Sequence, residues 1–247
     1  MCYTINARAT VQQLNKRYNA NNETPELHQL LYKLSGFHAK TTRIKDYRKL
    51  PVLTATDTKS FKYMQWGLIP FWTPQEKSKE FAINNLNAKG ETIFEKKSFA
   101  PSLKGKRCII PITGFFESRT CNKENYPYFI HLKDADIFSL AGIYDTWKDK
   151  ETGSIINSFS IITTQANALM AKIHNKQLRM PVILTLEKEQ QWIQSEISEK
   201  EITELIQPLD ELLMVAHTVD KKVNNSKIDS NFPDVTNVVT YPELGLF

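Results

Sequence analysis

The chain begins Met1-Cys2-Tyr3-Thr4, and these residues carry groups that react with aldehydes. Cysteine is small enough for the initiator methionine to be removed, and we expect this removal to leave Cys2 with a free α-amine beside its thiol. Because the pKa of an α-amine is roughly 7.7–8.0, part of it is neutral at cellular pH and can form an imine. The thiol can then close a five-membered thiazolidine. The alternative is a buried thiol in a first strand with no chemical role.

Six short motifs follow in a fixed order. They are Trp66-Gly-Leu-Ile-Pro70 with Trp72, Asn87-Ala-Lys-Gly-Glu-Thr92, Arg107 to Glu117, Gly142 to Trp147, Thr163 to Asn167, and His174 followed by Arg179 to Leu184. Behind an N-terminal Met-Cys, they resemble the SOS-response-associated peptidase (SRAP) family, the abasic-site-processing proteins. The resemblance runs from residue 2 to about residue 225, nearly the whole chain.

The resemblance implies a single α+β domain over residues 1–247, with a curled, mainly antiparallel sheet or barrel, flanking helices and a tail from about 226. It also implies covalent attachment of Cys2 to abasic sites in single-stranded DNA, alongside autopeptidase and weak lyase activity. When the family's functional residues are matched to positions in this sequence, Cys2 is the nucleophile and Asn87 orients the reactive N-terminus. Glu117 is the acid/base carboxylate, and His174 is a second proton-handling side chain.

Three positions depart from the family pattern. Lys89 stands where arginine is common, and lysine cannot grip a phosphate bidentately. Ser118 follows the glutamate where an aromatic residue is frequent. The spacer 175–178 between His174 and Arg179 is longer than the shortest family form, so the position of Arg179 is not fixed by the motif.

Residue chemistry supports the implied roles. An abasic sugar is mostly a closed hemiacetal, and its opening needs a proton donor. Glu117 follows Phe115 and Phe116, and desolvation by such neighbours raises a carboxyl pKa toward neutrality. A water-facing glutamate is the alternative. His174 ends a predicted helix, where helix capping is an equally good interpretation, and Asn87 alone reads as a turn residue.

Aromatic and basic side chains near the motifs are candidates for DNA contacts, since aromatic rings stack on bases and cations follow phosphates. We expect base stacking from Trp66, Phe71 and Trp72, at least one of which should instead belong to the core. The residues expected to contact the phosphate backbone of the DNA are Lys89, Arg107 and Arg179. Single-stranded DNA is favoured because the lesion must be splayed into a pocket.

Composition limits the class of protein. The net charge of +5 is compatible with a polyanionic partner. Cys2, Cys108 and Cys121 have no CxxC spacing, so we expect no disulfide framework, metal or cofactor. No apolar run reaches the ~20 residues that span a bilayer, and the N-terminus lacks a signal-peptide pattern. We expect a monomeric, cytoplasmic, DNA-associated protein without membrane contact.

Periodicity predicts the elements that position these residues. Helices are expected over 9–20, 24–36, 165–174 and 186–197 and from Ser198 to Pro208. Strands are expected at the N-terminus and over 61–66, 108–116, 128–132, 137–144, 159–164, 181–184 and, weakly, 235–240. Residues 37–60 are interpreted as a surface connection.

Two other functions stay open on the sequence. One is an amidohydrolase that uses Cys2 as an N-terminal nucleophile with its own amine as base. The other is a non-catalytic module that binds single-stranded nucleic acid.

Overall fold

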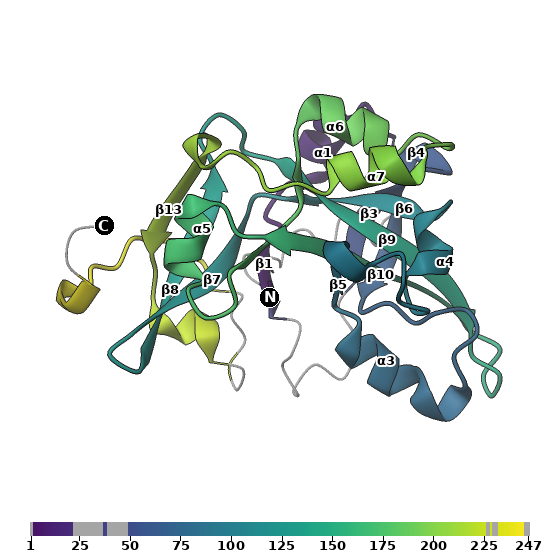
Figure 1. Ribbon diagram of the computed structural model, residues 1–247, viewed down its shortest axis with the longest axis horizontal. Coiled ribbons are helices and arrows are strands. Elements are labelled where there is room, and N and C mark those ends of the chain that lie inside the picture. The colour runs from purple at the N-terminus through teal and green to yellow at the C-terminus, as the bar shows by residue number, and fades with distance from the viewer. Residues whose placement is uncertain (1, 22–36, 39–48, 226–227, 229–231, 245–247) are drawn as a thin grey trace.

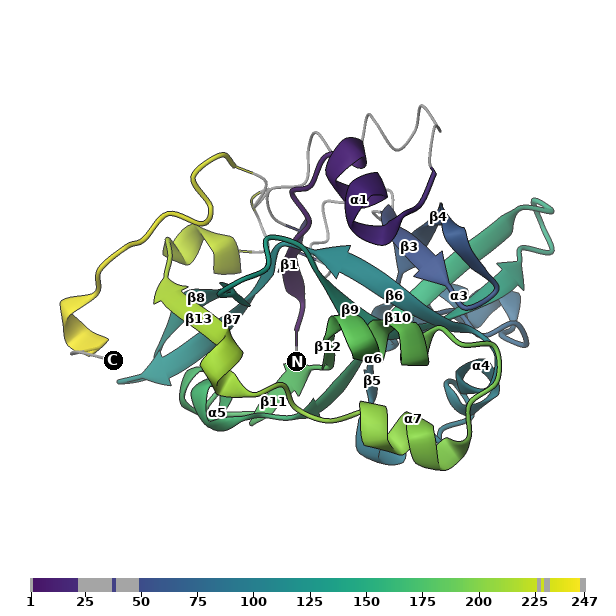
Figure 2. The same cartoon turned by 90° about the horizontal axis from the view of Figure 1, so that it is seen from above.

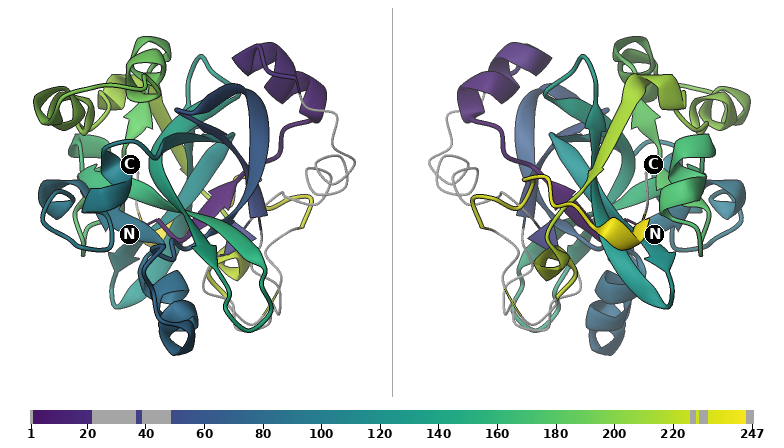
Figure 3. Two further views of the ribbon diagram at one scale, coloured as in Figure 1. Left: turned by 90° about the vertical axis from the view of Figure 1, so that its right-hand side faces the viewer. Right: turned by 90° about the vertical axis from the view of Figure 1, so that its left-hand side faces the viewer.

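The computed structural model describes residues 2–21, 37–38, 49–225, 228 and 232–244. Its centre is a closed ring of strands, in which each strand is hydrogen-bonded to the next and β10 returns to pair with β4 and β9. The ring consists of β3 (Lys49–Thr54), β4 (Asp57–Trp66), β6 (Arg107–Ile112), β9 (Phe138–Lys148) and β10 (Ile155–Gln165). Figure 3 shows these strands crossing around a common interior, with helices outside.

Short strands extend this barrel, and a second sheet lies beside it (Figure 1). The extensions are β5 (Asn87–Lys89), β11 (Arg179–Pro181) and β12 (Ile183–Leu184). The second sheet has the order β13 (Met214–Thr218), β8 (Glu124–Leu132), β7 (Gly114–Cys121), β1 (Thr4–Asn6) and β2 (Phe37–His38). All pairings are antiparallel except those of β10 with β4 and β5. The predicted curled, mainly antiparallel sheet with flanking helices is therefore confirmed.

Helices cover the outside of the sheets. They are α1 (Val11–Tyr18), α3 (Ser78–Asn84), α4 (Ala100–Leu103), α5 (Ala168–Ile173), α6 (Leu186–Trp192) and α7 (Glu199–Leu205). Single 3₁₀ turns occupy Gln75–Lys77, Gly90–Thr92, Glu211–Leu213, Lys221–Asn224 and Pro242–Leu244. The α7 helix begins with a capping box formed by Ser198 and Glu201.

The chain passes from the barrel to the second sheet at Thr113. Along β6, Cys108 and Ile110 face one core and Ile109 the other, as strand alternation requires. At Thr113 the backbone N–H donates to the carbonyl oxygen of Asn6 (2.8 Å), and the chain continues directly into β7. A single core cluster includes Ile110 from the barrel and Phe115 from the second sheet. Figure 2 shows β1 in the middle of the molecule, with β7 and β8 on one side and β6 and β9 on the other.

Several sequence predictions need correction. The expected surface connection over 37–60 contains the β3 strand, whose Leu50, Val52 and Leu53 are buried. The strand expected over 235–240 is absent; this segment instead lies beside β13, where the N–H of Val239 donates to the carbonyl oxygen of Thr218 (2.9 Å). The helix expected over 24–36 lies outside the described residues. Among the described residues, no helix is long and apolar enough to cross a bilayer.

Candidate active site

Cys2 directly precedes β1 and is 1% exposed. Because β1 and β7 pair with Thr4 opposite Phe116, the residues before Thr4 run alongside those that follow Phe116. The Cys2 thiol lies 3.7 Å from the carbonyl oxygen of Thr4. Burial, and then the nearby charge of Glu117, raises the pKa of this thiol. The sulfur is therefore held as a thiol rather than a thiolate.

Asn87 fixes the same N-terminal segment from the barrel side. It begins β5, which pairs in parallel with β10, and its side-chain Nδ2 donates to the carbonyl oxygen of Cys2 (2.9 Å). The Trp66 indole N–H holds the preceding residue by donating to the carbonyl oxygen of Leu86 (2.7 Å). The Oδ1 atom of Asn87 is buried and has no hydrogen-bond partner within the described part of the chain. Asn87 thus holds the backbone of Cys2 in place.

Glu117 lies on β7 and is 9% exposed. Burial raises the pKa of its carboxyl group to about 7. The structure therefore contradicts the water-facing alternative, and the carboxyl group can hold a proton near neutral pH, as a general acid must.

His174 follows the last residue of α5 and faces Glu117. Its Nε2 lies 3.5 Å from Oε2 of Glu117, and its Nδ1 lies 2.9 Å from the carbonyl oxygen of Arg179. A carbonyl can only accept, so Nδ1 carries the proton and Nε2 presents its lone pair to Glu117. Burial lowers the pKa of His174 to about 4. Between about pH 4 and about pH 7 the pair is therefore a neutral imidazole next to a protonated carboxyl group.

A pocket of about 310 Å³ opens onto this pair. Its walls are formed by Tyr3, Thr4, Phe116, Glu117, Ser118, His174, Gln177 and Asn224. Asn224 donates from Nδ2 to the Ser118 hydroxyl (2.8 Å), so a residue far along the chain closes one side. Cys2 and Asn87 are buried and are not among the lining residues.

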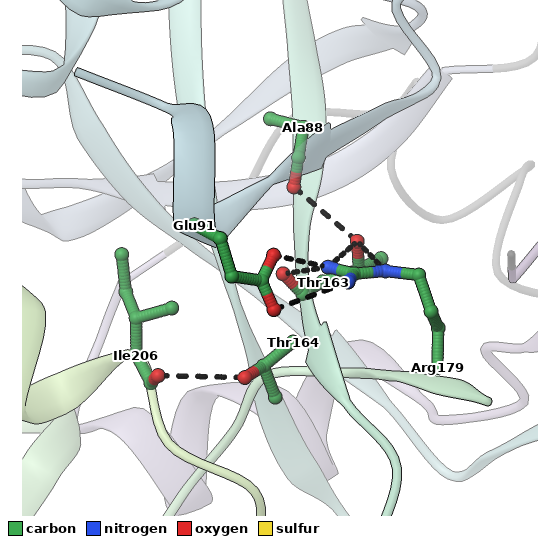
Figure 4. Close-up of polar contacts among 6 residues, drawn as sticks. All are labelled: Ala88, Glu91, Thr163, Thr164, Arg179 and Ile206. Atoms are coloured by element: carbon green, nitrogen blue, oxygen red, sulfur yellow. Dashed lines mark hydrogen bonds and ion pairs between the residues drawn. The ribbon is translucent and has the colours of Figure 1, made fainter. Parts of the chain in front are cut away.

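Arg179 is buried and is held in a polar network whose other charged member, Glu91, is exposed (Figure 4). Its guanidinium donates to both carboxylate oxygens of Glu91, at 3.1 and 2.8 Å, and to the backbone and side chain of Thr163. Burial by itself would raise the pKa of Glu91, but the hydrogen bonds from Arg179 and the backbone, together with the positive charges of Arg179 and Lys89, hold it below its ordinary value. Since Arg179 is only 8% exposed, its guanidinium cannot meet a phosphate without giving up part of this network.

The predicted DNA-contacting residues divide by exposure. Phe71 and Trp72 are 58% and 41% exposed, whereas Trp66 is 2% exposed and stacks on Phe159 in the core. The expectation that at least one of the three aromatic residues is core is confirmed, and Trp66 is not available for stacking on bases. Lys89 is exposed on β5.

The prediction that Arg107 contacts DNA is wrong in this structure. Arg107 is 0% exposed. Its guanidinium donates to backbone carbonyls at the C-terminal ends of α4 and α6: those of Leu103, Lys104, Trp192, Gln194 and Ser195. These carbonyls lack partners within their own helices, so the arginine satisfies them and joins the two helices to β6.

Three further residues at or near the site were not identified from the sequence. Glu91 belongs to a quoted motif, and its spacing from Asn87 was the available signal. Gln177 lies in the spacer that departs from the family pattern. Asn224 carries no local signal, because only the tertiary fold brings it to the pocket.

Comparison with known proteins places this geometry among related chains. The family model described as SOS response associated peptidase (SRAP) matches residues 1–226. The abasic site processing protein YoqW of Bacillus subtilis (strain 168) is 40% identical over 169 residues, which cover 68% of this chain and 72% of YoqW. The abasic site processing protein HMCES of Rattus norvegicus is 32% identical over 200 residues, covering 69% of this chain and 54% of HMCES.

Solved structures share the fold. A crystal structure of a protein from Bacteroides thetaiotaomicron superposes with a TM-score of 0.89 at 36% identity, covering 97% of this chain and 100% of that one. A protein from Bordetella bronchiseptica superposes with a TM-score of 0.73 at 20% identity over 89% of this chain and 100% of that one, which supports the fold alone.

Proposed function

Because the chain belongs to the SOS response associated peptidase (SRAP) family, we propose that it processes abasic sites in DNA by covalent attachment of Cys2. The observation that carries the proposal is the convergence of Asn87, Glu117 and His174 around the N-terminal segment, beside a pocket open to a substrate. The names of the relatives supply the substrate class.

The reaction begins once Met1 has been removed, by the chain itself or by another peptidase. Opening the hemiacetal breaks the bond between C1′ and O4′. Glu117 gives its proton to O4′, and the proton of the C1′ hydroxyl leaves to water. The α-amine of Cys2 then adds to the aldehyde carbon, and one water is lost to form an imine. The amine acts first because burial keeps the Cys2 sulfur protonated.

The thiol completes the adduct. Its sulfur bonds to the imine carbon, the thiol proton passes to the Glu117 carboxylate, and the nitrogen takes one proton from solvent. Glu117 thus ends in its starting form, and the net change is the loss of one water. His174 holds the Glu117 carboxyl group from one side through Nε2. Without ring closure the imine can eliminate the 3′ phosphate, which accounts for weak lyase activity.

The DNA is held as a single strand. Phe71 and Trp72 offer exposed rings for stacking, and the ammonium of Lys106 lies 5.6 Å from the centre of the Phe71 ring. Lys89 contributes a phosphate contact next to Asn87. An extruded sugar reaches a pocket of this kind most easily where no complementary strand must be displaced.

Mass spectrometry after mixing the protein with an abasic oligonucleotide tests the proposal. A stable adduct should appear on the peptide that begins with Cys2, with a mass equal to the two reactants minus one water. A strand with a tetrahydrofuran in place of the abasic sugar has no aldehyde and should give no adduct. An amidohydrolase or a non-catalytic binding module would leave both strands unmodified.

A further inference from the structure

The loop from Asn175 to Leu178 connects α5 to β11 and forms part of the pocket wall. It turns back sharply, because the N–H groups of Gln177 and Leu178 both donate to the carbonyl oxygen of His174 (3.2 and 2.9 Å). Leu178 has φ of 53°, a left-handed conformation that a leucine side chain rarely adopts. The loop is therefore held in one defined shape.

Asn175 fastens this loop to β7. Its side-chain Nδ2 donates to the carbonyl oxygen of Thr120 (2.9 Å), and its Oδ1 accepts from the N–H of the same residue (3.0 Å). This paired contact imitates one step of a strand ladder, on the strand that carries Glu117. The loop thus keeps a fixed position relative to the catalytic carboxyl group.

Gln177 is the residue that this arrangement brings to the pocket. Its side chain is exposed, lines the pocket and makes no side-chain hydrogen bond within the described part of the chain. The other amide on the wall, that of Asn224, already donates to Ser118. Gln177 therefore offers an adjacent donor and acceptor at the mouth of the pocket.

We propose that Gln177 is a specificity-determining residue that hydrogen-bonds the nucleobase next to the abasic sugar, with Asn175 as the residue that positions it. This inference rests on the proposed function. An amide pairs its donor and acceptor bidentately with adenine, whereas a carboxylate accepts from the amino group of cytosine. On the edge that carries N7 in purines, adenine alone presents an adjacent donor and acceptor, so adenine is the flanking base that we expect Gln177 to prefer.

Competition among abasic oligonucleotides that carry each of the four bases on either side of the lesion tests the proposal. The wild type should form adduct about fivefold or more faster when one flank is adenine, the lower end of what a bidentate contact discriminates. Gln177→Ala should lose the preference, so that its rates on the four flanks become equal. Gln177→Glu should transfer the preference to cytosine.

Two more variants separate recognition from general loop damage. Asn175→Ala leaves Gln177 intact but releases the loop, and should also erase the preference. Lys176→Ala changes an exposed neighbour in the same loop and should keep the preference, even if all rates fall together. Equal rates on all flanks with the wild type, or an unchanged preference in Gln177→Ala, would overturn the inference.

The outcome is distinguishable from failure of the proposed function. Absence of adduct on every strand contradicts the covalent mechanism alone. The preference is then measured as equilibrium affinity for tetrahydrofuran strands with the same flanks, where the wild type should still favour adenine. Equal affinities there would overturn the role of Gln177.

Discussion

Glu117 and His174 come from different parts of the fold and meet with 3.5 Å between Oε2 and Nε2. Burial moves the pKa of Glu117 up to about 7 and that of His174 down to about 4. Both groups are therefore driven toward their neutral forms, and below about pH 7 the proton resides on the carboxyl group. This location of the proton suits a site in which Glu117 donates a proton and His174 orients the carboxyl group of Glu117.

Replacing Glu117 with glutamine should slow adduct formation by about 10²–10⁴-fold, because a general acid contributes an effect of this size. Binding to a tetrahydrofuran strand should stay nearly unchanged. The measurement is single-turnover crosslinking in parallel with equilibrium binding. His174→Ala should cause a smaller loss if His174 mainly orients Glu117. A wild-type crosslinking rate for the glutamine variant would leave Glu117 with a structural role only.

The pH profile gives a second test of the acid. The acid form of Glu117 is lost as pH rises through about 7, whereas the α-amine loses its neutral form below roughly 7.7–8.0. The wild-type rate should therefore pass through a maximum near pH 7–8. In Glu117→Gln the fall at high pH should disappear and the fall at low pH should remain. If the rate of this variant still falls at high pH, a group other than Glu117 causes that fall.

Stability should depend on pH through the same carboxyl group. The pKa of Glu117 is about 7 in the folded protein and 4.5 ordinarily. The contribution of this group to the free energy of unfolding is therefore fully present below about pH 4.5 and is lost as the pH rises through about 7. The full difference corresponds to about 3 kcal/mol. Denaturant unfolding should show Glu117→Gln gaining about 2–3 kcal/mol relative to the wild type between pH 5 and pH 8. An equal pH dependence in both proteins contradicts the raised pKa.

Much of the fold follows from local sequence signals. The Ser198–Glu201 capping box of α7 and the short apolar runs on either side of Thr113 are visible as patterns. The β3 strand was missed because Pro51 and the polar residues before it favour a loop, although Pro51 lies within the strand opposite Tyr63. Its assignment as a strand depends on its pairing with β4 and β6, which no local pattern contains.

The site divides in the same way. Glu117 carried its own signal, since the adjacent Phe115 and Phe116 predicted desolvation. Arg107 follows Lys104 and Lys106 and resembled a phosphate-binding group, but the ends of two helices enclose it. A sequence pattern shows which residue types could react or bind phosphate. Whether such a residue is buried depends on elements that are distant in the sequence.

Lys89 should contribute about one phosphate contact. Binding to undamaged single strands should weaken with salt, and Lys89→Ala should lower the slope of log affinity against log salt by about 0.7. Lys89→Arg should tighten binding through a bidentate contact. The matched control is Lys200→Ala, which removes an exposed lysine of α7 that pairs with Glu204 at 3.9 Å and should leave the slope unchanged. An unchanged slope in Lys89→Ala removes this residue from the DNA path.

The sharpest prediction separates the two nucleophiles of Cys2. Cys2→Ala keeps the α-amine, so it should still form an imine with the opened sugar, but it cannot close the ring. It should bind reversibly, nick abasic strands slowly by β-elimination, and be trapped only when borohydride is added. The wild-type adduct should survive heating in denaturant without reductant.

An uncleavable N-terminal extension, which converts the amine to an amide and spares the thiol, should abolish both imine formation and the heat-stable adduct. A heat-stable adduct from the extended protein would mean that the thiol acts alone, and the thiazolidine mechanism would then be wrong.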